Sequence, residues 1–251
     1  MSNYRLGLVS VSFRALSPER ILSAVKESGL SCIEWGSDVH APKDDIKGLE
    51  DIARLQKEYG IACSSYGTYF RLGVTPAREL EDYIKAAGIL GTDILRLWCG
   101  NKGSQEYSAG EKERLFGECA AAAEIAQKNG VKICMECHNG TFTDRKASAE
   151  ELMRAVNSSA FRMYWQPNQY RTEEENLEYA RALADYTEHI HVFNWKEEKR
   201  LALGDGVDIW RKYLEIFGDR KTLLLEFMPD DDINSLPVET DALKRIAGEK
   251  K

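Results

Sequence analysis

Short apolar runs alternate with longer amphipathic segments along the whole chain, and this alternation constrains the fold most. Runs of this length and composition are typical of buried strands. We predict strands at Tyr4–Arg14, Cys32–Gly36, Ala62–Phe70, Ile94–Gly100, Lys132–His138, Phe161–Pro167, His189–Trp195 and Thr222–Pro229. The strand starts recur about every 30 residues, which is roughly one strand and one helix each. Amphipathic segments such as Ser17–Gly29, Gly48–Gly60 and Glu111–Gly130 predict the helices between them.

Eight strand–helix units without a linker or a low-complexity tract predict a single α/β domain over residues 1–251, a (β/α)8 TIM barrel. Helix ends support this reading, because Ser17-Pro18 is typical of a helix start and Gly29 of a helix stop. A doubly wound sheet is the alternative. It usually has five or six strands and a glycine-rich first turn, whereas the first strand here is followed by Val11–Ala15 with no G-x-G-x-x-G pattern.

Charge and cysteine content narrow the class of protein. The net charge is −7, which disfavours a nucleic-acid partner because phosphates require a basic face. No apolar run has the roughly 18 residues that a membrane span needs, and residues 1–14 do not resemble a signal peptide. The six cysteines show no disulfide spacing, so we expect reduced thiols in a cytoplasmic protein. A homo-oligomer is compatible with these features.

Four polar residues stand near the ends of the last four predicted strands: Glu136, Gln166, His191 and Glu226. The active site of such a barrel lies at the carboxyl ends of its strands. Two carboxylates, an imidazole and an amide oxygen suit a divalent cation such as Mn, Mg, Co or Zn. A hydrogen-bonded polar core is the alternative interpretation of each residue alone, but four on successive strands favour a metal site.

The chain also resembles a known family. The segments that carry the resemblance are IEWGSDVHAP at 33–42, SYGTYFRLG at 65–73, LRLWCGNKGS at 95–104 and LGDGVDIW at 203–210, together with the strand ends at Glu136, His191 and Glu226. It is similar to the xylose isomerase-like barrels of the sugar phosphate isomerase/epimerase type. These include ketohexose 3-epimerases, inosose dehydratases and endonuclease IV.

The resemblance implies that Glu136, His191 and Glu226 are metal ligands and that the two glutamates also move protons. On the sixth strand the chain departs from the family pattern D-x-x-H, because Gln166 and Gln169 take the places of the aspartate and the histidine. Gln166 can still ligate through its carbonyl oxygen, but one negative charge is lost. We therefore expect weaker metal binding, and Gln169 at the position of a substrate-contacting histidine.

The implied chemistry is proton transfer next to a carbonyl group of a sugar or sugar phosphate. The metal stabilises the enediolate that develops, one carboxylate removes the proton, and the other returns a proton. Return to the opposite face gives epimerisation, and return to the neighbouring carbon gives isomerisation. The sequence does not separate the two outcomes, nor does it decide which of Glu136 and Glu226 removes the proton.

Several further residues are candidates for substrate contact. His40 and His138 are placed to contact hydroxyl groups, and Arg96 and Lys196 to bind a carboxylate or phosphate. Sugars stack on aromatic faces, and the candidates to wall the pocket are Trp35, Tyr66, Trp98 and Trp165. Structural roles remain open for all of these, as loop or ligand-orienting histidines, salt bridges or aromatic packing.

Other functions remain open. The same site would serve a metal-dependent dehydratase or lyase acting on a polyol or keto acid. The loss of the aspartate on the sixth strand would also fit a non-catalytic sugar-binding barrel. A repair nuclease is disfavoured, because the resemblance to endonuclease IV would imply three zinc ions and many histidines, and the chain has four histidines.

Overall fold

Eight parallel strands close into a barrel in the computed structural model, which describes residues 4–249. Around the barrel the order is β1-β10-β7-β6-β5-β4-β3-β2, so each strand lies beside its neighbour in the sequence and β10 closes against β1. The strands are β1 (Arg5–Val9), β2 (Cys32–Gly36), β3 (Ala62–Leu72), β4 (Ile94–Cys99), β5 (Lys132–Glu136), β6 (Phe161–Trp165), β7 (Thr187–Val192) and β10 (Thr222–Leu225). The predicted TIM barrel is confirmed.

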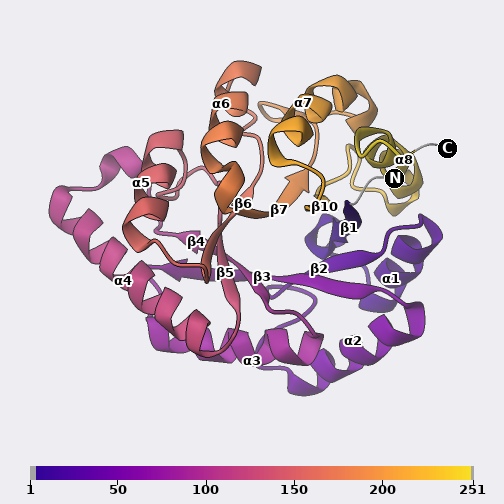
Figure 1. Ribbon diagram of the computed structural model, residues 1–251. Helices are drawn as coiled ribbons and strands as arrows, with labels where there is room; N and C mark the ends of the chain where they lie inside the picture. Colours follow the sequence, from indigo (N-terminus) through magenta and orange to yellow (C-terminus); the bar gives the residue numbers. More distant parts are fainter. Residues whose placement is uncertain (1–3, 250–251) are drawn as a thin grey trace.

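Eight α-helices surround the barrel, as Figure 1 shows. They are α1 (Pro18–Glu27), α2 (Ile46–Tyr59), α3 (Leu80–Leu90), α4 (Ala109–Lys128), α5 (Lys146–Val156), α6 (Glu173–Leu183), α7 (Val207–Phe217) and α8 (Leu236–Ile246). Short 3-10 helices occupy Ser10–Phe13, Ala77–Glu79, Ser104–Glu106, Ala184–Tyr186, Leu203–Gly206 and Ile233–Ser235 (η1 to η6). A small antiparallel hairpin, β8 (Trp195–Lys196) and β9 (Lys199–Arg200), follows β7.

The first helix shows how the sequence sets the element boundaries. Ser17 has extended backbone dihedrals, and its hydroxyl accepts a hydrogen bond from the Arg20 backbone N–H, while Pro18 occupies the first turn. A free N–H of the first turn is thereby satisfied, and proline loses nothing where no helical hydrogen bond is made. The predicted start of this helix is confirmed.

Most strand ends differ from the prediction by a few residues, and the first and seventh strands show the reason. The first strand stops at Val9, and Ser10–Phe13 forms η1 instead of continuing to Arg14. The seventh starts at Thr187 and ends at Val192, with Trp195 in the separate hairpin. Apolar residues continue past both strand ends because the connecting segments are buried too, so hydrophobicity alone does not mark where strand pairing stops.

Strand alternation separates the outer core from the inside of the barrel. Side chains that point outward pack against the helices in the main hydrophobic core. A second, smaller cluster fills the barrel interior: Val9, Val11, Cys32, Cys134, Tyr164 and Leu224. Residues two positions further along β2, β5, β6 and β10 point the same way, and these are Glu34, Glu136, Gln166 and Glu226. A polar layer therefore lies above the apolar interior, at the carboxyl ends of the strands.

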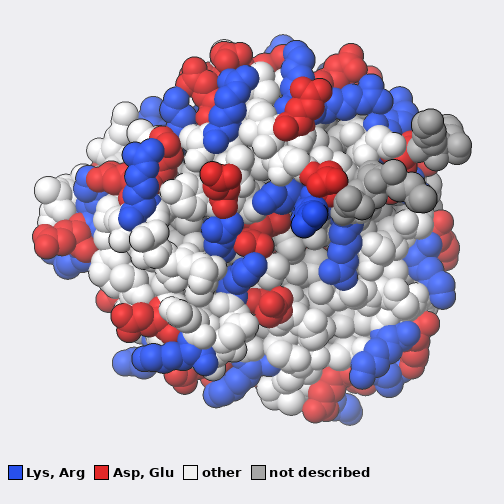
Figure 2. Space-filling model, in the orientation of Figure 1, with Lys and Arg blue, Asp and Glu red and all other residues white. Residues whose placement is uncertain are grey.

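The structure also shows where the cysteines, the charged side chains and the apolar helices of residues 4–249 lie. All six cysteines are buried and free in the structure. Acidic and basic side chains are interspersed around the face in Figure 2, with no broad basic area on that face. Among residues 4–249, no helix combines the length and the apolar character that crossing a bilayer requires.

Gly67 on β3 leaves the space that the polar layer needs. A Cβ atom there would lie 2.7 Å from the Arg96 guanidinium and 2.7 Å from Glu34 Oε1. We therefore expect Gly67→Ala to lower the free energy of unfolding by about 1–3 kcal/mol, the usual cost of overpacking a core. Urea unfolding measures this.

Gly88→Ala is the matched control, because an added Cβ meets nothing within 4 Å at this exposed position inside α3. That variant is expected to gain about 0.5–1 kcal/mol, since alanine is the better helix former. An equally stable Gly67→Ala protein would show that the space beside Arg96 is not needed.

Candidate active site

Arg96 on β4 lies between two buried carboxylates and pairs with both. Its Nε donates to Glu34 Oε1 on β2 at 2.9 Å, and its Nη1 donates to Glu136 Oε2 on β5. The side chains of these three residues are at most 4% exposed. Buried charges are tolerated when they are paired and hydrogen-bonded, so this Glu34–Arg96–Glu136 ion-pair chain accounts for three charges inside the barrel.

Both carboxylates of the ion-pair chain are held in the charged form. Burial alone would raise the pKa of Glu34 and of Glu136, but the neighbouring Arg96 and His191 outweigh it and lower both pKa values below the ordinary range. The second oxygen of Glu34 accepts from the Ser65 hydroxyl at 2.9 Å, and Ser65 lies 3.0 Å from the Tyr164 hydroxyl. Glu34 is thus fixed from two sides.

His191 on β7 stands at the centre of the other polar residues. Its Nδ1 lies 3.0 Å from Gln166 Oε1, 3.5 Å from Glu226 Oε2 and 3.6 Å from Glu136 Oε1. Its Nε2 lies 3.6 Å from Glu34 Oε1 on the other side of the ring. Burial lowers the pKa of His191, but Glu226 and Glu34 outweigh it and raise the pKa to about 10.

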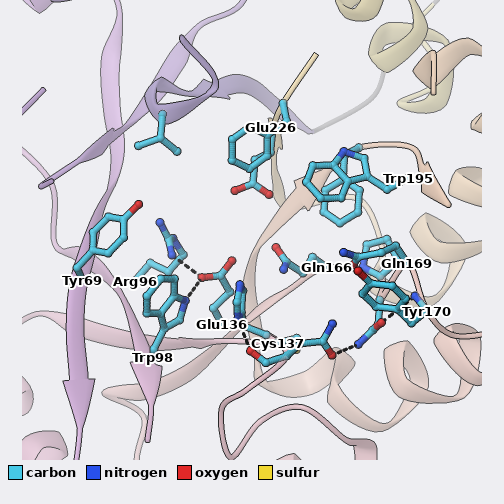
Figure 3. Close-up of a pocket in the computed structure, with 17 residues that line it drawn as sticks. Tyr69, Arg96, Trp98, Glu136, Cys137, Gln166, Gln169, Tyr170, Trp195 and Glu226 are labelled. Atoms are coloured by element: carbon cyan, nitrogen blue, oxygen red, sulfur yellow. Dashed lines mark hydrogen bonds and ion pairs between the residues drawn. The ribbon is translucent and has the colours of Figure 1, made fainter. Parts of the chain in front are cut away.

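The four predicted ligands therefore converge. Donor atoms of Glu136, His191 and Glu226 lie within 4.8 Å of one another, and Gln166 Oε1 lies beside His191 Nδ1. In Figure 3, Glu226 points down while Glu136 and Gln166 point up into the same space. Oxygen and imidazole donors of this kind suit a divalent cation.

Charge balance supports the same fit. Glu34, Glu136 and Glu226 oppose the single guanidinium of Arg96, so two negative charges remain when His191 is neutral. One divalent cation would balance them. His191 also presents Nδ1 to the donor set and Nε2 toward Glu34, and a carboxylate behind a ligating imidazole is a common arrangement at metal sites. The residues present therefore fit a divalent ion.

Glu136 and Glu226 differ in their surroundings. Glu136 Oε2 accepts from Arg96 and from the Trp98 indole N–H, which leaves Oε1 facing His191. For Glu226, burial raises the pKa above the ordinary value even though His191 lowers it. One carboxylate is thus held ionised and the other has an increased affinity for a proton, a combination typical of acid–base pairs.

A pocket of about 460 Å³ opens above this cluster. Its aromatic lining comprises Tyr69, Trp98, Tyr170, Phe193, Trp195 and Phe227. Its uncharged polar lining includes the amides of Asn139, Gln166, Asn168 and Gln169. Aromatic walls with a few convergent polar groups are typical of small-molecule sites.

Most of the predicted substrate contacts lie at this pocket. Trp98, His138 and Gln169 line it, and so does Arg96, whose charge is directed to Glu34 and Glu136. Lys196 is exposed and lines a neighbouring hollow on the other side of the 167–169 segment.

His40 is not among the lining residues of the pocket. It is buried near Trp35, with Nδ1 3.1 Å from the Ser10 hydroxyl. This position fits the structural role that the sequence left open for a loop histidine.

Three of the four predicted wall residues face away from the pocket, so that prediction is wrong for Tyr66, Trp35 and Trp165. The Tyr66 hydroxyl donates to the Ala41 carbonyl at 2.6 Å, and its ring packs toward α3. Trp35 and Trp165 lie next to the inward Glu34 and Gln166, so alternation turns them outward to the helices. Of the four, Trp98 is the one that lines the pocket.

Several pocket residues were missed in the sequence. Asn139 and Phe227 directly follow the predicted His138 and Glu226, so their position next to strand ends was the available signal. Tyr69 lies on β3 two residues after the inward Gly67, so strand alternation was the signal for it. Tyr170 and Trp195 come from segments whose course over the barrel a sequence pattern does not show. Phe227 has a left-handed backbone (φ 53°), and its N–H donates to the Ser12 hydroxyl on η1 at 2.9 Å. This contact fixes the chain directly after Glu226.

Comparison with known proteins identifies the family. The sequence profile described as xylose isomerase-like TIM barrel matches residues 22–246, and the chain belongs to this family. The resemblance seen in the sequence is thereby confirmed. No curated protein matches the chain by sequence at a significant level.

Solved structures show the same fold at low sequence identity. The probable 3-DHS dehydratase AsbF from Bacillus anthracis has a TM-score of 0.80 at 17% identity, with 96% of this chain and 98% of that chain covered. D-psicose 3-epimerase from Clostridium cellulolyticum H10 has a TM-score of 0.71 at 13% identity, with 96% and 98% covered. A Mycobacterium smegmatis xylose isomerase-like TIM barrel protein in complex with magnesium has a TM-score of 0.69 at 13% identity, with 97% and 96% covered.

The role of Gln166 as a ligand can be tested by replacing it with a charged side chain of the same length. Gln166→Glu keeps the side-chain length and adds one negative charge beside His191 Nδ1, so Mn²⁺ should bind about tenfold more tightly. Isothermal titration measures the affinity. Gln169→Glu, at the pocket rim, adds the same charge away from the donor set and is expected to change the affinity much less. Equal or weaker binding by a folded Gln166→Glu variant would exclude Gln166 as a ligand.

Proposed function

We propose that the protein is a divalent-metal-dependent isomerase or epimerase that moves a proton next to the carbonyl group of a sugar. The observation that carries this proposal is the convergence of Glu136 and Glu226 on one space. The two glutamates come from β5 and from the end of β10, on either side of β6 and β7, and each has an oxygen within 3.6 Å of His191 Nδ1. Two carboxyl groups facing one substrate atom from different strands allow a proton to leave on one side and return on another.

Glu136, Gln166, His191 and Glu226 would hold the metal ion. When bound, such an ion supplies Lewis-acid stabilisation of the negative charge that develops on the substrate oxygens. The magnesium complex of the Mycobacterium smegmatis relative supports a metal in this family. The candidate ions are Mn, Mg, Co and Zn.

The two glutamates are suited to different protonation states. Glu136 is held ionised by Arg96 and Trp98, which engage Oε2 and leave Oε1 toward the pocket. Glu226 has the raised pKa and is the better proton carrier at rest. A pair with opposed proton affinities can serve as base and acid in the same turnover.

The pocket supports a sugar as the substrate. Trp98 and Trp195 line the pocket with aromatic rings, and the amides of Asn139, Asn168 and Gln169 can donate to and accept from hydroxyl groups. The lining fits a small polar molecule, and we propose no nucleic-acid or membrane partner.

A dehydratase is the second candidate, because the family neighbours include a probable dehydratase as well as epimerases. The same carboxylate pair can remove a proton next to a carbonyl and then assist the loss of a hydroxyl group as water. Product analysis separates the two: an epimerase or isomerase conserves substrate mass, and a dehydratase lowers it by one water.

Glu136→Gln and Glu226→Gln are each expected to lower kcat by about 10²–10⁴, the usual contribution of a general acid or base. An amide keeps the shape of the side chain but has no basic site. Exchange of the substrate α-proton with heavy water, followed by NMR over a panel of ketoses, measures the step directly.

Glu239→Gln is the matched control, since this buried glutamate accepts from the Leu203 backbone N–H outside the pocket and an amide oxygen can still accept there. Metal content is measured in each variant, because lost ligation would imitate lost catalysis. A Glu136 or Glu226 variant that retains its metal and exchanges the proton at the wild-type rate would remove that residue from the mechanism.

A further inference from the structure

Charged groups at the pocket are few and already paired. Among its described lining residues, Arg96, Glu136 and Glu226 carry formal charges. Arg96 is the cation of this set, and its guanidinium is bound to Glu34 and to Glu136. It therefore cannot pair with an anionic substrate without leaving a buried carboxylate unpaired, which is strongly destabilising.

Cations near the rim are engaged as well. Arg14 pairs with Asp38, and its Nη1 lies 3.4 Å from the Tyr69 hydroxyl. Arg200 pairs with Asp231 and stacks on two pocket aromatics, 5.1 Å from the Trp195 ring and 4.8 Å from the Phe227 ring. Both guanidinium groups support the pocket wall through existing contacts.

Arg71 and Lys196 also lie outside the pocket lining. Arg71 stacks over the Trp98 ring at 4.2 Å and donates to the Gly100 carbonyl at 3.0 Å. Lys196 lines the neighbouring hollow together with Arg171.

The place where barrels of this fold often bind phosphate is occupied by carboxylates. That place is formed by the loops after the last two barrel strands and the N-terminus of a short extra helix. Here the short helix is η6, and Asp230, Asp231 and Asp232 precede it. Asp232 Oδ1 accepts from the Asn234 backbone N–H at 2.9 Å, and Asp230 accepts from the Asp232 N–H at 3.1 Å and from the Ser235 hydroxyl at 2.6 Å.

These aspartates fill the donors that would otherwise meet a phosphate, and they add like charge. A pocket with paired cations, neutral amides and an acidic loop recognises hydroxyl groups and disfavours anions. On this basis we infer that the substrate is an uncharged sugar, and that sugar phosphates and sugar-derived keto acids are rejected. This inference rests on the proposed function for the reaction, but the charge preference itself rests on the pocket.

The test compares matched pairs of ligands on the Mn²⁺-loaded protein. Free ketohexoses, their 6-phosphates and 5-keto-D-gluconate are measured for binding by saturation-transfer NMR and for α-proton exchange in heavy water. At least one free ketohexose is expected to bind about tenfold more tightly than its phosphate and than the keto acid. Equal or tighter binding of the charged member overturns the inference, and so does an absence of binding by every free sugar.

Binding and proton exchange together distinguish a failure of the charge preference from a failure of the proposed reaction. If free sugars bind selectively but none exchanges its proton, the proposed reaction fails and the charge preference stands. If a phosphate binds and exchanges fastest, the reaction stands and the charge preference fails.

A charge variant tests the cause of the selectivity. Replacing Asp230 and Asp232 together by asparagine keeps their size and removes two negative charges from the loop after β10, while Asp231 is kept because it pairs with Arg200 behind the pocket wall. The discrimination against the 6-phosphate should fall about tenfold, while binding of the free sugar stays unchanged. The matched control changes two exposed carboxylates of the same size on the helices, Asp82 and Asp241, to asparagine. If the loop variant discriminates as strongly as the control, the aspartate loop is not the source of the selectivity and the inference loses this support.

Discussion

The buried pairing of Arg96 with Glu34 and Glu136 is the contact on which the rest of the site depends. Each partner alone would be an uncompensated charge inside the barrel, where the loss of one member of a buried pair is strongly destabilising. The pairing leaves one oxygen of Glu136 committed to Arg96 and Trp98 and the other directed toward His191. It also places Glu34 behind His191 Nε2, so that Nδ1 faces Gln166 and Glu226. Orientation of the ligands thus follows from how the buried charges are paired.

Strand geometry puts this charge cluster at the mouth of the barrel. Alternation along each strand fills the barrel interior with Cys32, Cys134, Tyr164 and Leu224, and the next inward position on each of these strands is polar. The absence of a side chain at Gly67 leaves room for the guanidinium between its partners. The loops then complete the pocket with aromatic rings and amides. The polar layer holds the metal-ligand candidates, and the uncharged rings and amides of the pocket lie above it. This arrangement is suited to a cation in the polar layer and a neutral, hydroxyl-rich molecule in the pocket.

Much of this arrangement could be predicted from the sequence, for identifiable reasons. The period of apolar runs predicted the barrel, and polar residues at strand ends predicted the convergence of Glu136, Gln166, His191 and Glu226. Strand alternation also determines that Tyr66, Trp35 and Trp165 face the helices, because each lies one residue from an inward position. The sequence assigned no role to Glu34, because its pairing with Arg96 crosses from β2 to β4. Tyr170 and Trp195 depend on the course of the chain after β6 and after β7, which no local pattern determines.

We propose that the ion-pair chain orients four donors around a divalent cation. Diffraction from crystals grown with millimolar Mn²⁺, recorded for the anomalous signal of manganese, tests it most directly. We expect one strong peak about 2.0–2.3 Å from Glu136 Oε1, His191 Nδ1 and Glu226 Oε2, close to the usual range for oxygen and nitrogen ligands, with Gln166 Oε1 in or next to the coordination shell. Arg96 should remain paired with Glu34 and Glu136. Two results would contradict this proposal. One is a site without a peak, in which His191 Nδ1 is still hydrogen-bonded to Gln166. The other is a peak whose ligands are other residues.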